Sequence, residues 1–296
     1  SPESQPDSEY LLTVPVSMPA VGLIQLMQVM VAFKTLGLSP GELAKSFKVA
    51  TGHSQGIAIP TALSQVTDEA SFYAISEKVL GLLMLTGVIP QLECPYHPLS
   101  PSDEADVLTD GETPYPMVSV QGVSKRVLEG YIAEFNSDQP ERGSTVNLSL
   151  VNTYDQFIVS GKLENVVQFA RLVRGKSAPL GEDQSQIPFT QRKPTIRTRF
   201  ISMTAPFHTD LQRDVVDRQC AHAASRGWIL NATDLGIPVR ACDDGHDIRS
   251  EADLTRYLFE SICVLPLNWP VATDQHGITH IVDFGPGGLN GFGSLT

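Results

Sequence analysis

The sequence predicts an α/β protein in which a parallel-sheet core carries an inserted ferredoxin-like α+β subdomain. Three observations indicate this class. The chain has 296 residues, 42% of them hydrophobic, which is enough for a substantial core in one large domain or two smaller units. Its middle part follows a β-α-β-β-α order. Near its end, ITHIVDFGPGG is an apolar run that stops at glycines, as a buried parallel strand does where it opens onto a site.

The first apolar segment predicts a helix rather than a membrane span. Residues 1–9 are polar and form a flexible lead-in. Leu11–Phe33 has no charged residue, but prolines and glutamines interrupt it, and a spanning helix needs about 20 mostly apolar residues. No basic segment precedes it, which argues against a signal peptide. We expect an extended entry ending near Ser17, which caps a largely buried helix from Pro19 to Leu36.

The next elements surround a glycine-flanked serine. Ser39 and Glu42 have the spacing of a capping box and predict a short helix. Val49–Thr51 is predicted as a short strand. Gly56–Ser64 is predicted as a helix, and Asp68–Gly87 as a longer helix with a broad apolar face.

A loop rich in proline, serine and acids, residues 95–114, marks a boundary in the chain. The segments after it predict, in order, strand YPMVSVQG, helix SKRVLEGYIAEFN, strands TVNLSLVN and DQFIVSG, helix KLENVVQFARLVRG and strand RTRFISM. This is the split βαβ order of a ferredoxin-like unit. We therefore divide the chain into the N-terminal part of the core (1–112), the insert (113–203) and the C-terminal part of the core (204–296).

The C-terminal part of the core is predicted to begin with a helix over Thr209–Arg226. A short strand near GIPVRA and a helix from about Glu251 follow, and the final β-run completes the chain.

Charge and cysteine content narrow the function classes. The formal net charge is −12, which argues against a nucleic-acid binder. The four cysteines include no C-x-x-C pair, and no His/Cys cluster has zinc spacing, so we expect free, buried thiols and no metal. These features, with no predicted membrane segment, indicate a cytoplasmic protein. The cysteines are Cys94, Cys220, Cys242 and Cys263.

Ser54 is the candidate nucleophile. It stands in GHSQG, between a predicted strand and a predicted helix, as in a G-x-S-x-G elbow. The flanking glycines allow the two backbones to approach, and the helix N-terminus directs N–H groups at the seryl oxygen. The motif alone is a weak signal, because it is frequent by chance, and a glycine-flanked turn explains it equally well.

A serine nucleophile needs a base, and His208 is the best-placed histidine. It follows TAPF after an apolar strand and stands at the start of a predicted helix, where catalytic groups tend to lie. His53, beside Ser54 in sequence, should point the other way and pack. The other histidines are predicted in loops, in a polar helix or beside the last strand.

Three segments carry a resemblance to a known family: GHSQG, DQSQIPFTQRK…RFISMTAPFHT and THIVDFGPGG. With SPGELAKSFKVATGHSQG and VNLSLVNTYDQFIVSG, they resemble the acetyltransferase domain of the fungal fatty acid synthase β subunit, within the malonyl-CoA:ACP transacylase superfamily. The match runs from about Tyr10 to the C-terminus. Malonyl-specific relatives usually carry leucine where this chain has Gln55. The resemblance implies a hydrolase-like or flavodoxin-like parallel-sheet core with a ferredoxin-like insert.

The resemblance also implies a mechanism, with a Ser54–His208 dyad. Ser54 would attack an acyl-CoA thioester, and the acyl group would pass to the phosphopantetheine thiol of an acyl carrier protein. The backbone N–H of Gln55 would be one oxyanion donor. A backbone carbonyl shortly before the last strand, at Gln275 or His276, would orient the histidine. No bound cofactor is implied beyond the acetyl-CoA substrate, and the expected partners are the carrier protein and the rest of a multidomain synthase.

The chain departs from the superfamily pattern in two places, one that bears on acyl specificity and one that bears on the oxyanion site. Malonyl-specific relatives carry an arginine about 25 residues after the serine, whereas this chain has Val79 and Leu80 there. An apolar wall leaves a malonyl carboxylate without a counter-ion and favours an uncharged acyl group such as acetyl, although both residues also fit a plain helix core. The family's Gly-Gln-Gly segment, which supplies the second oxyanion donor, is not found in the 53 residues before Ser54.

Further substrate contacts are predicted in and beside the insert. QRKPTIRTR contributes Arg192, Lys193, Arg197 and Arg199 without an acid, so it could contact CoA phosphates or an acidic carrier protein; a solvated strand edge is an equal alternative. Asn152 lies in the predicted hairpin, where the family places an amide near the serine. It is a candidate for the acyl pocket, although asparagine also favours turns.

Two other functions remain open on the sequence. A thioesterase or lipase-type hydrolase could use the same Ser-His pair, although no acid is clearly placed to orient the base. A structural domain of a larger synthase, with its catalysis incomplete, is the alternative outside the enzymes.

Overall fold

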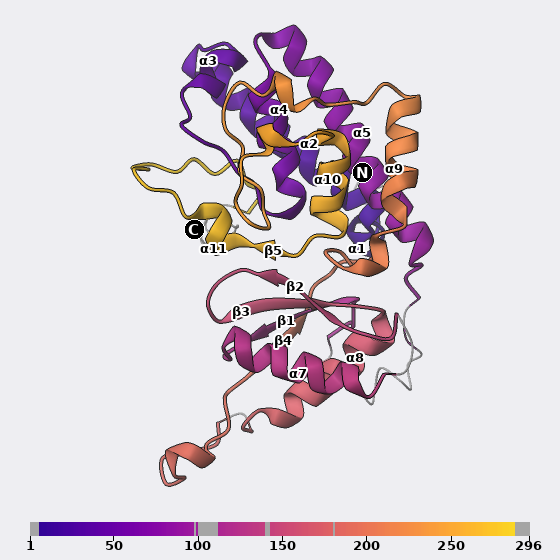
Figure 1. The fold of residues 1–296 in the computed structure, drawn as a ribbon, viewed down its shortest axis with the longest axis vertical. Coiled ribbons are helices and arrows are strands. Elements are labelled where there is room, and N and C mark those ends of the chain that lie inside the picture. The colour runs from indigo at the N-terminus through magenta and orange to yellow at the C-terminus, as the bar shows by residue number, and fades with distance from the viewer. Residues whose placement is uncertain (1–5, 98, 100–111, 140–142, 180, 288–296) are drawn as a thin grey trace.

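The computed structural model describes residues 6–97, 99, 112–139, 143–179 and 181–287. Figure 1 shows a largely helical region stacked on a sheet that carries its own helices. The helical region contains α1 (Ser8–Leu12), α2 (Val14–Leu36), α3 (Pro40–Lys45), α4 (Ala58–Gln65), α5 (Glu69–Glu93), α9 (Val215–Ser225), α10 (Leu254–Cys263) and α11 (Trp269–Thr273). The predicted loop at residues 95–114 falls largely outside the described residues.

Helix α2 begins at Val14, so the predicted start at Pro19 with a Ser17 cap is wrong. The N-cap residue is Thr13, and Pro19 lies inside the helix. Pro19 is tolerated because packing outweighs the lost hydrogen bond: every third or fourth residue faces the core. Gly22 permits this contact, since a Cβ there would lie 2.3 Å from Leu83 of α5. The buried residues are Val14, Met18, Gly22, Leu26, Val29 and Phe33.

The predicted capping box is confirmed at α3. The Ser39 side chain accepts from the N–H of Glu42, and the Glu42 carboxylate accepts from the N–H of Ser39. Helix α5 is capped in the same way by Asp68 and Ser71, and it runs beyond the predicted end at Gly87 to Glu93.

Helices α2 and α5 could each cross a membrane by length and composition alone. In the structure they pack against each other, and α5 also contacts α4, α9 and α10. Helix α5 buries large apolar side chains in the core: Phe72, Val79, Leu82, Leu83, Leu85 and Ile89. Core packing therefore accounts for the apolar composition of α5.

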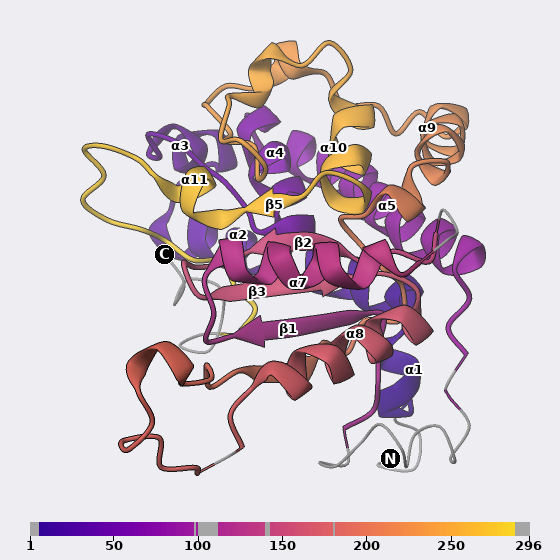
Figure 2. The same ribbon diagram turned by 60° about the horizontal axis from the view of Figure 1, so that its bottom comes forward.

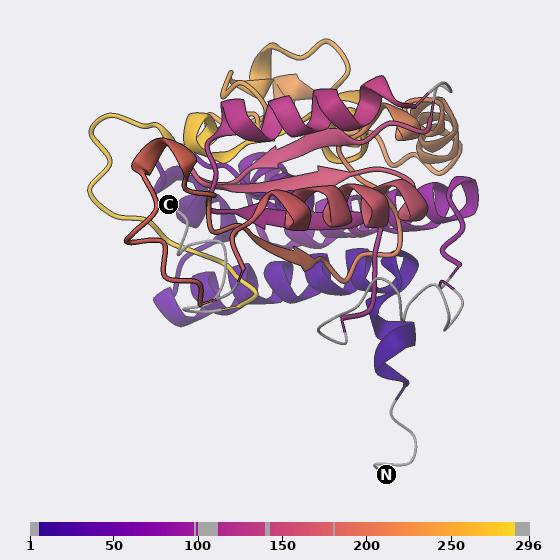
Figure 3. The ribbon, with the colours of Figure 1, turned by 90° about the horizontal axis from the view of Figure 1, so that it is seen from below.

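The insert folds in the predicted element order. Its elements are β1 (Met117–Gln121), α7 (Lys125–Ser137), β2 (Asn147–Val151), β3 (Gln156–Ser160), α8 (Leu163–Lys176) and β4 (Arg197–Phe200). The strand order is β4-β1-β3-β2, and these pairs are antiparallel, as in a ferredoxin-like unit. Helices α7 and α8 cover one face of the sheet (Figure 3).

A short strand joins the sheet to the helical region. β5 (Leu267–Asn268) pairs in parallel with Leu150 and Val151 of β2. Figure 2 shows β5 between the insert sheet and the elements of the helical region. The insert and the helical region thus share one five-stranded sheet.

In the described residues of the core, parallel pairing is reduced to one bridge between Ala50 and Val239. Ala50 donates to the carbonyl of Pro238 and accepts from the N–H of Arg240. The predicted strands at Val49–Thr51 and GIPVRA therefore meet as expected, but only over this bridge. Residues 279–284, predicted as the last buried strand, form no strand and are mostly exposed, because no described segment pairs with them.

Two hydrophobic clusters underlie the two regions. The larger joins α2, α4, α5, α9 and α10 and receives Met117, Leu150 and Ile158 from the sheet. The smaller lies between the opposite face of the sheet and helices α7 and α8. Helix α9 begins only at Val215, because Thr209 caps a separate 3-10 turn first. The division into 1–112, 113–203 and 204–296 stays a prediction.

Candidate active site

Ser54 begins a 3-10 turn, η2 (Ser54–Ile57), directly before α4. Its φ angle is 53°, in the left-handed region that non-glycine residues rarely adopt. Gly52 makes the tight bend possible, since a Cβ there would lie 2.1 Å from the carbonyl oxygen of Gly56. Gly56 has room for a side chain. The segment therefore has the shape of a nucleophile elbow, with a backbone held in an unfavourable conformation at its serine.

His208 lies against Ser54. Its Nε2 is 2.8 Å from the Ser54 Oγ, although 154 residues separate the two in sequence. Its φ angle is 54°. Among the described non-glycine residues, only Ser54 and His208 have a positive φ. Both members of the predicted pair are therefore held in left-handed backbone by the surrounding fold.

The other ring nitrogen of His208 sets the tautomer. Nδ1 is 2.7 Å from the carbonyl oxygen of Leu265, which can only accept, so Nδ1 carries the proton. Nε2 is then free to accept from the Ser54 hydroxyl. Burial lowers the pKa of His208 to about 4, so the ring is neutral at pH 7 and can take a proton.

The prediction that the carbonyl of Gln275 or His276 orients His208 is wrong. The carbonyl of His276 accepts from Lys48 Nζ at 3.2 Å, whereas His208 donates to Leu265. Leu265 follows the C-terminus of α10, where helix carbonyls are left without partners, and precedes Pro266. A predicted helix end before a proline could have indicated free carbonyls in this segment. It does not identify which of them faces the histidine.

Gln55, the predicted oxyanion donor, lies in the same turn as Ser54. Gln55 is the second residue of η2, and the first N–H groups of a helical turn have no acceptor within it. Its N–H belongs to the residue directly after Ser54, on the same turn. This position stays a prediction for the transferring acyl group.

His53 packs away from Ser54, as its place in the sequence predicts. Its ring contacts Trp269 edge to face at 5.2 Å, and its Nε2 is 2.9 Å from the Oδ1 of Asn152. Burial, opposed by that bond, lowers its pKa to about 4. Asn152 therefore does lie beside the elbow, but its side chain binds His53. The sequence did not predict this link between the insert and the elbow.

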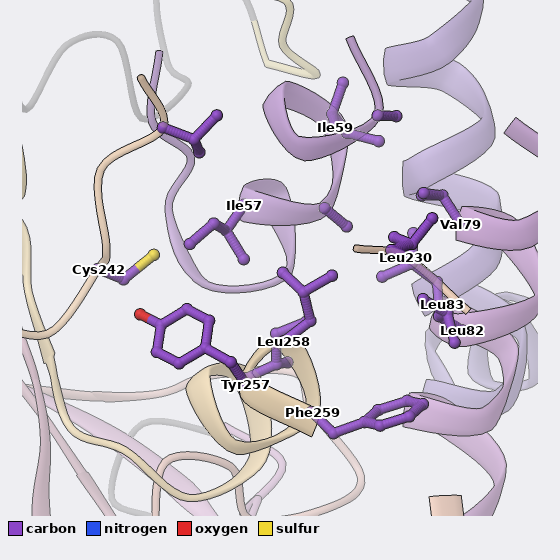
Figure 4. Packing of buried hydrophobic residues seen from close by; sticks show 14 of the residues in the cluster. Ile57, Ile59, Val79, Leu82, Leu83, Leu230, Cys242, Tyr257, Leu258 and Phe259 are labelled. Atoms are coloured by element: carbon purple, nitrogen blue, oxygen red, sulfur yellow. The ribbon is translucent and has the colours of Figure 1, made fainter. Parts of the chain in front are cut away.

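The structure places Val79 in the core rather than against the pair. Val79 is fully buried in α5, and Figure 4 shows it beside Leu230, apart from Ile57 of the elbow. Leu80 is half-buried and packs near Gly22. Their predicted role in the acyl pocket stays a prediction.

Two of the four predicted cations line a common cavity. Arg197 and Arg199 of β4 stand opposite Gln121 and Ser119 of β1, so these side chains share one face of the sheet. The cavity they line has a volume of about 350 Å³. No described carboxylate forms an ion pair with either guanidinium.

Arg192 and Lys193 lie elsewhere, on an exposed loop. The Arg192 guanidinium donates to the carbonyls of Ser185 and Ile187 within that loop. The backbone of Lys193 pairs with the Gln184 side chain. The four predicted cations therefore do not form one patch.

One group of side chains has the donor types of a metal site. Donor atoms of Asp243, Asp244 and His246 lie within 4.8 Å of one another. The His246 ring is already shared between Asp244 and Glu251, at 2.6 Å from each. Those contacts raise the pKa of His246 despite its partial burial. The third member, Asp243, accepts from the Tyr257 hydroxyl, so contacts within the protein already engage all three side chains.

Comparison with known families gives one match that covers most of the chain. Residues 1–194 match the family described as starter unit:ACP transacylase in aflatoxin biosynthesis. Over the full chain, the sequence is 36% identical to fatty acid synthase subunit beta of Saccharomyces cerevisiae. It is 38% identical, over 99% of the chain, to the same subunit of Schizosaccharomyces pombe. The chain spans 14% of the length of each relative.

Solved structures share the fold at lower identity. FabD from Acinetobacter baumannii superposes with a TM-score of 0.64 at 17% identity, over 96% of this chain and 73% of that one. MCAT from Streptococcus pneumoniae gives a TM-score of 0.62 at 15% identity, over 98% and 76%. These matches confirm the predicted fold class and extend over both the core and the insert.

Proposed function

The chain belongs to the starter unit:ACP transacylase family, and on that premise we propose that it transfers a starter acyl group from coenzyme A to an acyl carrier protein. Ser54 is the nucleophile and His208 the general base. The observation that carries the proposal is the 2.8 Å contact between the Ser54 Oγ and the Nε2 of a neutral, buried His208. A serine hydroxyl is a weak nucleophile unless a base lies within this reach.

The first half-reaction loads the serine. As Ser54 Oγ attacks the thioester carbonyl carbon, its proton moves to His208 Nε2. The carbonyl oxygen becomes an oxyanion, which the N–H of Gln55 stabilises. The C–S bond then breaks, His208 returns the proton to the departing CoA sulfur, and an acyl-Ser54 ester remains.

The second half-reaction runs in the opposite sense. The phosphopantetheine thiol of the carrier gives its proton to His208 Nε2 and attacks the ester carbonyl. The C–O bond to Ser54 breaks, and His208 protonates the seryl oxygen. Nucleophile, base and donor all come from the protein, so the transfer needs no resident cofactor.

The partner of His208 favours transfer over hydrolysis. Nδ1 donates to a neutral carbonyl, that of Leu265, rather than to a carboxylate. A carbonyl stabilises the imidazolium less than a carboxylate does, so His208 is a modest base. A modest base suffices for a thiol with a pKa near 8.5 but activates water poorly.

The cavity beside β4 suits phosphate groups. Arg197 and Arg199 face it together with Ser119, Gln121 and Gln156, which offers cations and hydrogen-bond donors at one place. CoA and carrier-bound phosphopantetheine both carry phosphates. If this is their site, Arg199→Ala raises KM for both substrates several-fold, most at low salt, and an unchanged KM would exclude it.

The acyl group proposed is uncharged, most simply acetyl. The segment EKVLGLLM offers no cation at the position where malonyl-specific relatives have arginine. If Val79 and Leu80 border the acyl group, as the sequence predicts, a malonyl carboxylate there would be desolvated without a counter-ion. One methylene contributes only about 0.8 kcal/mol, so an apolar wall accepts acetyl and slightly longer acyl groups alike.

The test is covalent labelling with radiolabelled acetyl-CoA, followed by addition of carrier protein. The proposal predicts a label on Ser54 that moves to the carrier thiol, and no label on Ser54→Ala. A Ser54→Ala protein that labels as well as the parent contradicts the nucleophile. Release of free acetate faster than transfer indicates a hydrolase, and the absence of any adduct indicates a structural domain.

A further inference from the structure

The side chain of Cys242 lies beneath the nucleophile elbow. Its Sγ donates to the carbonyl oxygen of Gly52 at 2.8 Å, two residues before Ser54. Cys242 is only 1% exposed, and Figure 4 shows it on a segment that faces Ile57 of the elbow. The fold brings Cys242 and Gly52 together, since 190 positions separate them in sequence.

The segment that carries Cys242 is itself anchored on several sides. The N–H of Arg240 donates to the carbonyl of Ala50, and the Thr51 hydroxyl donates to the carbonyl of Arg240. The carbonyl of Cys242 accepts from the N–H of Asn268 at 2.7 Å. The thiol therefore projects from a fixed backbone and not from a free loop.

The residues on either side of Cys242 are anchored as well. The Tyr257 hydroxyl of α10 donates to the carboxylate of Asp243, the residue that follows Cys242. The N–H of Ala241, the residue before it, donates to the carbonyl of His246. Movement of the thiol away from Gly52 would disturb these contacts on both sides.

The chemistry of the thiol fits a permanent donor. Burial raises the pKa of Cys242 to about 12, so the proton stays on sulfur at neutral pH. A thiol in this state is a weak donor and a poor nucleophile. A reactive or metal-binding role is thus disfavoured. The thiol instead donates to the Gly52 carbonyl, and the backbone of Ser54 also interacts with it.

We propose that Cys242 is a positioning residue, whose thiol holds the Gly52 carbonyl and so keeps Ser54 in its left-handed conformation with Oγ against His208. Ser54 and the residues before it form the bend, and a left-handed serine tends to relax towards ordinary backbone angles. The bond to Gly52 opposes that relaxation. The inference rests on the proposed function, because the atom that it positions is the nucleophile.

The same chain offers a matched control. Cys263 is also fully buried, and burial likewise raises the pKa of its thiol to about 12. Its sulfur contacts the Gln219 side chain of α9 and not the elbow. Replacing either cysteine with alanine removes one buried sulfur, but only Cys242→Ala removes a bond to the elbow.

The experiment measures the rate at which a fluorophosphonate labels Ser54, with thermal unfolding recorded for each protein. The probe reports nucleophile alignment without needing CoA or carrier recognition. Cys242→Ala should label about tenfold more slowly, because it loses one hydrogen bond that keeps the Ser54 Oγ aligned with His208. Cys242→Ser, which keeps a donor near Gly52, should recover most of the rate, and Cys263→Ala should label like the parent.

The outcomes separate this inference from the proposed function. Equal labelling of parent and Cys242→Ala refutes the positioning role alone, as does an equal loss in Cys263→Ala, which would indicate general packing. Failure of Cys242→Ser to recover the rate also refutes it. A parent that does not label at all refutes the nucleophile, and the positioning role with it.

Discussion

In the insert, β1 and β3 pair over five consecutive residues, and both strands bury apolar side chains against α7 and α8. At the elbow, by contrast, Ser54 and His208 are placed by single contacts: His208 to Leu265, His53 to Asn152 and Cys242 to Gly52. The insert is stabilised by many interchangeable contacts, and no single ladder bond is decisive. The elbow depends on a few contacts that cannot be exchanged, and it holds two residues in left-handed backbone. Loss of one side chain should therefore affect stability in the first region and reactivity in the second.

The largest expected effect is on the base. His208→Gln keeps a polar side chain of similar size but cannot accept the Ser54 proton and return it. We expect acyl loading of Ser54 to slow by about 1,000-fold, within the range for general bases. The measurement is single-turnover loading from acetyl-CoA, with circular dichroism to show that the fold is intact. A loss below about tenfold would mean that His208 is not the base.

A substitution in the insert should have the opposite effect, lowering stability without changing reactivity. Phe169 is fully buried in α8 and contacts the Phe135 ring at 5.7 Å. Phe169→Ala should lower the free energy of unfolding by about 3–5 kcal/mol, as truncation of a buried aromatic does. Measured in urea, this loss should leave the fluorophosphonate labelling rate of the folded protein nearly unchanged. A parallel fall in labelling would show that the two regions are not separable.

A change of pH should affect the elbow more than the insert, because His53 precedes Ser54 in the elbow and His208 contacts Ser54. Burial lowers both pKa values from 6.5 to about 4. Between pH 6.5 and about pH 4, the unfolded chain binds protons that the folded chain does not. The free energy of unfolding therefore has its full value above pH 6.5 and falls as the pH drops towards 4. The loss is on the order of 3 kcal/mol per histidine at pH 4.

Two measurements check this prediction. Urea unfolding at pH 7, 5.5 and 4.5 should show the progressive loss of stability. Labelling of Ser54 at the same pH values should stay near its neutral rate at 5.5 and decline only as His208 protonates near pH 4. A labelling profile with an apparent pKa near 6.5 would mean that His208 is not desolvated as the structure describes.

The same contrast explains which features the sequence could predict. The order of the insert follows from hydrophobic periodicity, and the Ser39–Glu42 capping box follows from side-chain chemistry that is local in sequence. Ser54 and His208 were found from motifs. The Leu265 carbonyl was not, because every residue has a carbonyl and only the packing of α10 selects this one. Residues 279–284 were predicted as a strand from composition, but a strand also needs a neighbour to pair with.

The smallest expected effect tests a side-chain hydrogen bond between the insert and the elbow. Asn152 of the insert accepts from His53 of the elbow at 2.9 Å, and both are buried. Asn152→Ala leaves the His53 N–H without that acceptor, which should cost about 1–3 kcal/mol of stability. The matched control is Asn165→Ala, whose side chain donates to Gly143 inside the insert at 3.4 Å. If the link transmits order to Ser54, labelling slows in Asn152→Ala and not in Asn165→Ala. If both label like the parent, the His53 bond serves stability only, and the insert supports the site through other contacts, such as the pairing of β2 with β5 and the bond from Asn147 to Thr209.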